Sequence, residues 1–309
     1  MARIDDILSG ASLVSKSVGQ PHQLMDLIYS DPGAGKTALA VELAQEVRGN
    51  GKILHLDSHE GFVTLQEKRW EHIRSNVVRK RIDNPSDLAA LGDAFLANHP
   101  KIRPFSVVVF DELSAWVKTI AIDYVRQKNN VGVGDLIPAI EGSDWNPIGY
   151  IVADILGRFQ RSGVHMVINA HSREKGDRDG GGTKKYSPNF TPLMNIDIQG
   201  MLHNVTLLTK TLAGRNQYER TLYTSPSASV VAKTRVEGMP SNPTRKQFIE
   251  LTGAWVRGEV ESQPVVKSAD VVTGKSKPER VTLPKDVPLP EDETDDDQPV
   301  IVDDTTTQQ

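Results

Sequence analysis

Short apolar runs alternate along the chain with segments whose apolar residues recur every three or four positions. A short apolar run bounded by turn residues predicts a buried strand, and the longer period predicts an amphipathic helix. We expect strands at residues 24–30, 51–57, 76–82, 105–112 and 163–171. Helices are expected between them, at residues 36–48, 85–99, 113–129 and 147–162.

Strands that alternate with helices predict a mostly parallel sheet with helices on its faces, which is the α/β class. The run at 105–112 is apolar over almost its whole length, as in a strand covered on both faces. Three more strand-like segments, at 204–212, 217–224 and 229–235, predict an antiparallel extension at one edge of this sheet.

Charge is divided unevenly between the body of the chain and its end. The 309 residues carry 36 basic and 40 acidic side chains, a net charge of −4. From Ser262 onward there are 5 basic and 11 acidic side chains, which leaves 31 basic and 29 acidic ones in the body. Such an acidic, proline-containing segment cannot bury enough apolar area to fold. We therefore expect a lead at 1–19, one domain at 20–261 and a disordered acidic tail at 262–309, which either solvates the protein or binds a partner.

The composition excludes several classes of protein. The chain has no cysteine, which excludes disulfides, thiol catalysis and cysteine-ligated metal sites. Its first residues contain two acids and no apolar core of secretory length, and no apolar run reaches the ~18 residues of a membrane span. We expect a cytoplasmic protein without a membrane partner.

The first predicted strand leads into a glycine-rich turn and then a helix. Residues 30–37 read SDPGAGKT, which matches G-x-x-x-x-G-K-[ST] except at the first position, where serine replaces glycine. The two glycines allow backbone conformations that turn N–H groups toward phosphate oxygens. The lysine adds a cation for the β- and γ-phosphates, and the threonine offers a hydroxyl to Mg²⁺. The residues predicted to bind ATP here are Ser30, Asp31, Pro32, Gly33, Ala34, Gly35, Lys36, Thr37 and Ala38.

Two carboxylates, Asp111 and Glu112, follow the apolar run at 107–110. Ligands of open α/β sheets bind at the carboxyl ends of the strands, so both acids are expected beside the phosphate loop. Asp111 is predicted to hold Mg²⁺ together with Thr37. Glu112 either polarises the attacking water or caps the following helix, where the helix dipole favours an acid.

Two other strand ends offer candidates for the catalytic chemistry. The second strand ends at Asp57 and is followed by Glu60, and the strand at 163–171 ends in Asn169 and His171. His171 or Asn169 could sense the γ-phosphate through a hydrogen bond. The alternative for each is an ordinary loop residue that faces water.

The order of these motifs resembles that of the RecA-like P-loop ATPases. It runs from the phosphate loop through a strand ending in D-x-x-E-G, a strand ending in Asp111, a polar strand end and a glycine-rich loop. Within this group the chain resembles the phage AAA/Sak-type single-strand annealing ATPases, over about residues 20–255. The resemblance implies ATP and Mg²⁺ as cofactors, catalysis by Lys36 and Glu60, a homo-oligomer with nucleotide between subunits, and a bacterial or phage-infected cytoplasm. Glu112 is closer to the AAA pattern, so the choice of the catalytic acid stays open.

The glycine-rich loop has the composition of a nucleic-acid contact. Residues 172–190 contain five basic and three acidic side chains, three consecutive glycines and two aromatic residues. RecA-like proteins bind single-stranded DNA with a loop at this position, so the resemblance implies DNA binding here. The expected contacts are made by Arg173, Lys184 and Lys185 to phosphates and by Tyr186 or Phe190 to bases. The alternative is a flexible surface connection without a ligand.

Two basic residues of the last strand-like segment have a further implied role. By the same resemblance, Lys233 and Arg235 reach the nucleotide of a neighbouring subunit and stabilise charge on the transferred phosphoryl group. The alternative is a solvated pair on an edge strand. Four tryptophans are expected in the core or in helix packing rather than in a base-stacking platform, namely Trp70, Trp116, Trp145 and Trp255.

Together these patterns predict an ATP-hydrolysing enzyme of phage type that acts on single-stranded DNA in recombination, annealing or replication. DNA or oligomerisation is expected to stimulate its activity. The alternative keeps the fold but changes the partner. It is a nucleotide-dependent switch or loader that acts on a protein, without direct DNA binding.

Overall fold

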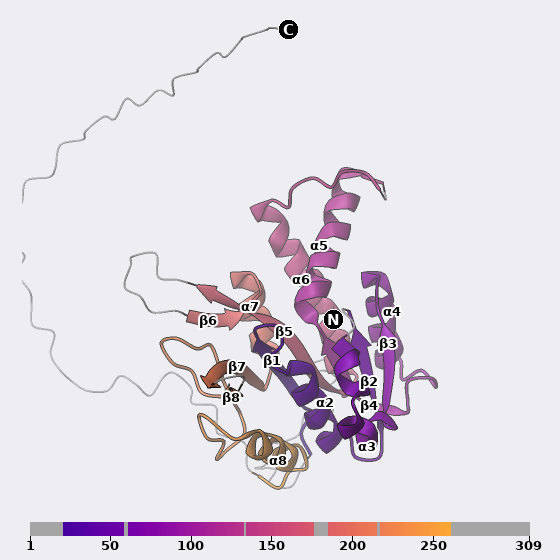
Figure 1. Ribbon diagram of the computed structural model, residues 1–309. Helices are drawn as coiled ribbons and strands as arrows, with labels where there is room; N and C mark the ends of the chain where they lie inside the picture. The colour runs from indigo at the N-terminus through magenta and orange to yellow at the C-terminus, as the bar shows by residue number, and fades with distance from the viewer. Residues whose placement is uncertain (1–20, 59–60, 133, 176–184, 215–216, 261–309) are drawn as a thin grey trace, which may run out of the picture. The chain divides into compact units, whose positions relative to one another are not determined.

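The computed structural model describes residues 21–58, 61–132, 134–175, 185–214 and 217–260 (Figure 1). These residues form a sheet with helices on both faces, as the alternating pattern predicts. The predicted lead at 1–19 and the predicted tail at 262–309 lie outside the described residues.

Among the described residues the sheet has eight strands, which are β1 (Met25–Ser30), β2 (Lys52–Asp57), β3 (Val77–Arg81), β4 (Phe105–Asp111), β5 (His165–Lys175), β6 (Lys185–Pro188), β7 (Asn204–Gly214) and β8 (Gln217–Tyr223). Seven of them follow the order β3-β2-β4-β5-β1-β7-β8, and β6 pairs with the far end of β5. The strands from β3 to β7 in this order run parallel, whereas β8 is antiparallel to β7 and β6 is antiparallel to β5. The expected fold class, mostly parallel with an antiparallel edge, is confirmed.

The antiparallel extension is smaller than the three late segments predicted. β7 lies parallel to β1, and the segment at 229–235 is not a strand. It makes two isolated bridges, from Val230 to Tyr186 and from Lys233 to Val205. Because β8 pairs with β7 from Leu207 onward, only the start of β7 is left on that edge for Lys233 to reach.

The helices are α2 (Lys36–Val47), α3 (Glu71–Arg74), α4 (Pro85–Leu96), α5 (Leu113–Asn129), α6 (Trp145–Arg161), α7 (Pro192–Met201) and α8 (Arg245–Val256). Short 3₁₀ turns lie at 61–66, 68–70 and 142–144. One face of the sheet is covered by α2 and α8, and the other by α4, α5, α6 and α7. In the described part of the chain, no helix combines the length and the apolar character that crossing a membrane requires.

The alternation of side chains along β1 shows how both faces are filled. Leu24 and Ile28 pack with the α2 and α8 side chains, whereas Leu27 and Tyr29 pack with those of the other helix layer. Phe110 of β4 lies on this second face, edge-on to the rings of Trp116 and Phe159. A strand buried on both faces explains why β1 and β4 read as apolar runs rather than as alternating patterns.

Local signals set the starts of the helices. The Asn84 side chain accepts a hydrogen bond from the N–H of Ser86, and Pro85 occupies the first position of α4. Thr244 and Gln247 form a capping box at the start of α8. These caps satisfy N–H groups that the helices themselves leave without a partner.

Candidate nucleotide-binding site

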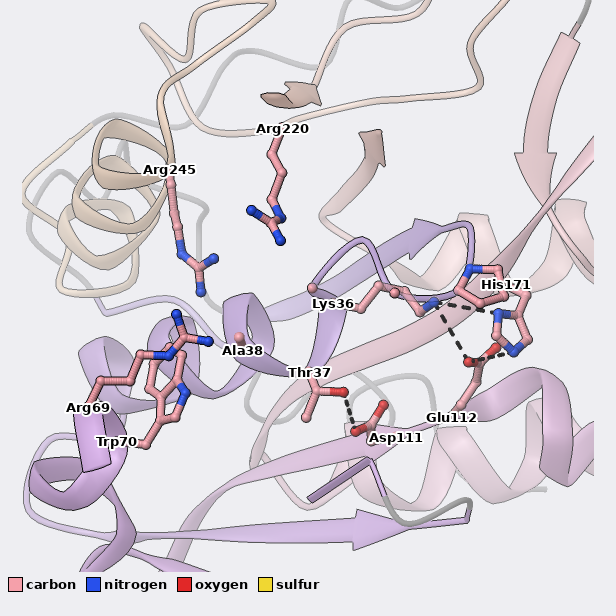
Figure 2. A pocket seen from close by; sticks show the side chains of 13 residues that line it. Lys36, Thr37, Ala38, Arg69, Trp70, Asp111, Glu112, His171, Arg220 and Arg245 are labelled. Atoms are coloured by element: carbon pink, nitrogen blue, oxygen red, sulfur yellow. Dashed lines mark hydrogen bonds and ion pairs between the residues drawn. The ribbon is translucent and has the colours of Figure 1, made fainter. Parts of the chain in front are cut away.

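Two pairs of aligned strand ends place the phosphate loop beside the acidic strand end. Parallel pairing aligns Ser30 of β1 with His171 of β5, and Asp57 of β2 with Asp111 of β4. Because the four strands run the same way, their carboxyl ends meet at one edge of the sheet. The loop, Asp111, Glu112 and His171 line one pocket of about 470 Å³ at this edge (Figure 2).

The phosphate loop connects β1 to α2. Gly33 and Gly35 have φ angles of 74° and 104°, in the left-handed region that favours glycine. Lys36 is the first residue of α2, so the N-terminal end of this helix lies at the pocket. Its buried ammonium donates to the carbonyl oxygen of Ser30 at 3.3 Å. Serine in place of the usual glycine leaves this contact intact, because the contact uses a backbone oxygen.

Asp111 is held by polar groups from three neighbouring elements. Thr37 Oγ1 donates to Asp111 Oδ2 at 2.7 Å, and Asn169 Nδ2 donates to Oδ1 at 2.9 Å. His55 Nε2 lies 3.3 Å from Oδ2. Burial opposes ionisation of this carboxyl, but its interactions with His55, Asn169 and Thr37 bring the pKa of Asp111 below its usual value. Asp111 is therefore an ionised carboxylate directed at the hydroxyl of the phosphate loop.

Glu112 forms a second polar cluster with Lys36 and His171. Glu112 Oε2 lies 3.8 Å from Lys36 Nζ and 3.0 Å from His171 Nε2, and Lys36 Nζ lies 3.5 Å from His171 Nδ1. Burial raises the pKa of Glu112 against the attraction of Lys36, and burial lowers the pKa of Lys36. Glu112 Oε1 is buried and accepts no hydrogen bond from any described residue.

Three arginines that no sequence motif marks also line the pocket. Arg220 reaches it from β8 and donates through Nε to the carbonyl oxygen of Ala34 at 2.8 Å. Arg245 begins α8, and the Cζ of Arg69 lies 5.3 Å from the ring centroid of Trp70. Figure 2 shows the three guanidinium groups extending toward the space beside the start of α2.

The lining suits an anionic nucleotide with Mg²⁺. Its four cationic and two acidic side chains are Lys36, Arg69, Arg220, Arg245, Asp111 and Glu112. A carboxylate and a hydroxyl 2.7 Å apart are oxygen ligands of the kind that Mg²⁺ takes, with phosphates and water in its other positions. Among the described residues, no group of three or more histidine or acidic side chains could hold a metal alone. The residues present therefore fit Mg²⁺ that arrives with a nucleotide.

The other candidates for water activation have different surroundings. Glu60 lies outside the described residues, so its predicted role stays a prediction. Asp57 is buried and pairs with Arg79 at 2.7 Å, which engages its carboxylate away from the phosphate loop. Of these candidates for water activation, Glu112 is the described carboxylate that lines the pocket.

The structure describes the loop at 172–190 only at its two ends. Of the predicted DNA contacts, Lys184 lies outside the described residues. Arg173 of β5 and Lys185 of β6 are exposed. The ring of Tyr186 is half-buried and packs against the core, and Phe190 is 3% exposed. Phe190 is thus a core residue, which leaves Tyr186 as the ring of the two that is expected to stack on bases.

Lys233 and Arg235 lie apart from the pocket of their own chain. Lys233 pairs with Val205, and the Arg235 N–H donates to the Asn204 side chain at 3.1 Å, both at the amino end of β7. The Lys233 ammonium donates to the carbonyl oxygen of Gln199 in α7. Burial, together with the nearby Arg235, lowers the pKa of Lys233 to about 8. Lys233 therefore has a partner within its own chain, whereas Arg235 is exposed.

A comparison with known families bears on the whole site. A family model described as an AAA domain matches residues 22–236, which is more than half of the chain. The matched segment includes the phosphate loop, both acids at the end of β4, His171 and Arg220. No curated protein matches the chain.

Proposed function

Since the chain belongs to the AAA domain family, we propose that it is a Mg²⁺-dependent ATPase that acts on single-stranded DNA. We place it among RecA-like proteins of the phage AAA/Sak-type annealing group, with a role in recombination, annealing or replication. One observation carries the ATPase part. The pocket combines a phosphate loop, an ionised Asp111 bonded to Thr37, and a second carboxylate, Glu112, which is ion-paired with Lys36 and His171.

The phosphate loop binds the β- and γ-phosphates through its backbone N–H groups and the Lys36 ammonium. This ammonium lies between the Ser30 carbonyl oxygen and Glu112, at the start of α2. Thr37 and Asp111 would hold Mg²⁺, which supplies positive charge to the phosphate oxygens. Arg220 adds a further cation to the pocket and is bonded to the Ala34 carbonyl oxygen of the loop.

We assign water activation to Glu112. Its Oε2 lies 3.0 Å from His171 Nε2, and its side chain lines the pocket beside the phosphate loop, where the carboxylate would take the proton of the attacking water. Burial raises its pKa, which makes its carboxylate a stronger base than that of an exposed glutamate. The family resemblance favours Glu60 for the same role, so variants of both residues are needed to separate them.

The part of the pocket that Arg69 and Trp70 line suits the base of the nucleotide. Trp70 is buried there, and the exposed Arg69 guanidinium lies over its ring. A planar guanidinium stacks on aromatic systems, so its outer face offers a surface for a purine.

The ATPase part is tested by measuring phosphate release from ATP with and without Mg²⁺. We expect turnover in the wild type that requires Mg²⁺, and none above background in Lys36→Ala. Binding of a fluorescent ATP analogue should be lost in Lys36→Ala but retained in Glu112→Gln. Equal phosphate release by wild type and Lys36→Ala would show that this pocket is not the site of hydrolysis.

The proposal that the protein binds DNA rests on the basic side chains at the ends of the loop at 172–190. It also rests on the position of this loop, which directly follows a residue of the nucleotide pocket, His171. β5 carries His171 into the nucleotide pocket and Arg173 just beyond it, so one strand joins the two proposed sites. Binding of labelled single-stranded DNA should weaken as salt rises. In the double variant Lys184→Ala, Lys185→Ala the affinity should fall and the salt slope should flatten by about 0.7 for each lost phosphate contact. Lys246→Ala, which removes an exposed cation of α8, is the matched control.

The alternative function is a nucleotide-dependent switch or loader that acts on a protein partner. In that case the acidic segment at 262–309 is the proposed contact with the partner, and the loop at 172–190 binds no DNA. Unchanged DNA affinity in the double lysine variant, or no DNA binding by the wild type, would favour this function.

We further propose that the active form is a homo-oligomer in which Arg235 contacts the nucleotide of a neighbouring subunit. The exposure of Arg235, away from its own pocket, supports this arrangement. Lys36→Ala and Arg235→Ala should each be inactive alone, but a mixture should regain activity where an intact loop meets an intact Arg235. A mixture as inactive as its components, or an Arg235→Ala protein with full activity, would contradict the proposal.

A further inference from the structure

A second pocket of about 540 Å³ lies between the start of α6, the first turns of α5 and the junction of β5 with β6. We propose that it binds one unpaired nucleotide of a DNA single strand, with the base against Trp145 and the adjoining phosphates against Lys118 and Arg173. This proposal rests on the proposed function and specifies where the strand is held.

The charge of the lining favours a phosphate. Lys118 and Arg173 are both exposed and line the pocket, and none of the described residues that line it is acidic. They come from α5 and β5, so two separate elements present cations to the same space. A nucleic-acid backbone supplies anionic groups at regular spacing, which two such cations can contact together.

The aromatic residue of the pocket differs from the other tryptophans. Trp70, Trp116 and Trp255 are each 5% exposed or less, whereas Trp145 is half-buried, packs against the core and lines the pocket. A ring held on one side by the core and accessible on the other is a platform on which a base can stack. Every base has such a face, so this contact is independent of sequence.

Two amides complete a site for a base. Asn146 and Asn189 are exposed and line the same pocket, and side-chain amides can donate to and accept from the edge of an unpaired base. The volume is within the range of pockets that enclose small ligands. A paired base has its edge engaged and both faces stacked, so this site selects single strands over duplex.

The pocket is joined directly to the nucleotide site. Ser114 lines it, and the Ser114 hydroxyl accepts a hydrogen bond from the His171 N–H at 3.1 Å. The N–H of Asn189 donates to the His171 carbonyl oxygen at 2.8 Å. The backbone of His171 thus bonds to two residues that line the second pocket, while its side chain contacts Glu112 in the first.

The test is the binding of a fluorescein-labelled oligothymidylate, followed by anisotropy over a range of salt concentrations. Trp145→Ala should weaken binding roughly tenfold or more, and Trp145→Phe should retain most of the affinity, because it keeps an aromatic face. Tyr150→Ala, which removes an exposed ring from the same helix, should bind like the wild type. Lys118→Ala and Arg173→Ala should each reduce the salt slope by about 0.7, and Lys246→Ala should leave it unchanged.

Each contrary outcome has its own meaning. If the wild type binds DNA but Trp145→Ala, Lys118→Ala and Arg173→Ala bind equally well, the pocket assignment is wrong and the proposed function stands. If duplex, or free thymidine monophosphate, competes as well as the single strand, the pocket does not select an unpaired nucleotide within a strand. If the wild type binds no single-stranded DNA, the DNA part of the proposed function falls together with the pocket.

Discussion

Thr37 Oγ1 donates a hydrogen bond to Asp111 Oδ2 across 2.7 Å, which joins the start of α2 to the end of β4. Because these two oxygens are the protein's ligands for Mg²⁺ in our account, Thr37→Val should lower ATP turnover by roughly tenfold or more. The Mg²⁺ concentration for half-maximal activity should rise as well, since valine keeps the shape but removes the hydroxyl. Thr119→Val, which removes a hydroxyl bonded within α5, should leave the Mg²⁺ dependence unchanged.

Glu112→Gln should bind ATP and hydrolyse it at least about a hundredfold more slowly, because the amide cannot take a proton from water. The pH profile adds a second readout. Since burial raises the pKa of Glu112, the wild-type rate should begin to fall at a higher pH than the usual 4.5 of a glutamate as the solution is acidified. Glu60→Gln is the parallel variant. Normal turnover in Glu112→Gln with loss in Glu60→Gln would move the role to Glu60.

Arg220→Ala should weaken ATP binding more than ADP binding, because the guanidinium is held against the phosphate loop through its bond to the Ala34 carbonyl. Losing one such cation is expected to cost roughly five- to tenfold in affinity for ATP. Arg161→Ala, which removes an exposed arginine from the end of α6, provides the control in the same titration. An equal loss for ATP and ADP would mean that Arg220 supports the loop without contacting the terminal phosphate.

Much of the fold could be predicted because β1 and β4 are buried on both faces and carry continuous apolar runs. The phosphate loop and Asp111 were predictable for the same reason, since each directly follows such a run. Arg69, Arg220 and Arg245 were not, because they reach the pocket only through tertiary packing. Arg220 is 186 positions from Ala34, and the pairing of β8 with β7 brings the two together.

The sequence at 229–235 predicts a strand that the structure does not contain. Its composition suits a strand, but β1 and β8 already occupy most of β7, so it can make only single bridges. Trp145 packs against the core as expected, but its partial exposure could not be predicted, because exposure at the first residue of α6 depends on how α5 and β5 pack around it.

The buried carboxyl group of Asp26 should make the free energy of unfolding depend on pH. Its side chain is fully buried in β1, Asn204 Nδ2 donates to its Oδ1 at 2.6 Å, and no described residue contacts its Oδ2 through a hydrogen bond. Burial raises the pKa of Asp26 from 3.8 to about 7, against this hydrogen bond. The folded chain therefore holds a proton that the unfolded chain releases, so the stabilisation is complete below about pH 4 and is lost as pH rises through about 7.

Urea unfolding of the wild type and of Asp26→Asn at pH 5 and pH 8 measures this effect. Asparagine stays neutral, so from pH 5 to pH 8 the free energy of unfolding of the wild type should fall by about 2.5 kcal/mol relative to that of Asp26→Asn. A wild-type-to-variant difference that does not change with pH would mean that Asp26 does not titrate in this range.

We propose that this pocket hydrolyses ATP in response to single-stranded DNA. The most direct measurement is the steady-state rate of phosphate release by the full chain with Mg²⁺ and ATP, with and without single-stranded DNA, alongside Lys36→Ala. We expect a basal rate in the wild type, a severalfold higher rate with DNA, and background rates in Lys36→Ala under both conditions. A wild-type rate that is the same with and without DNA would contradict it.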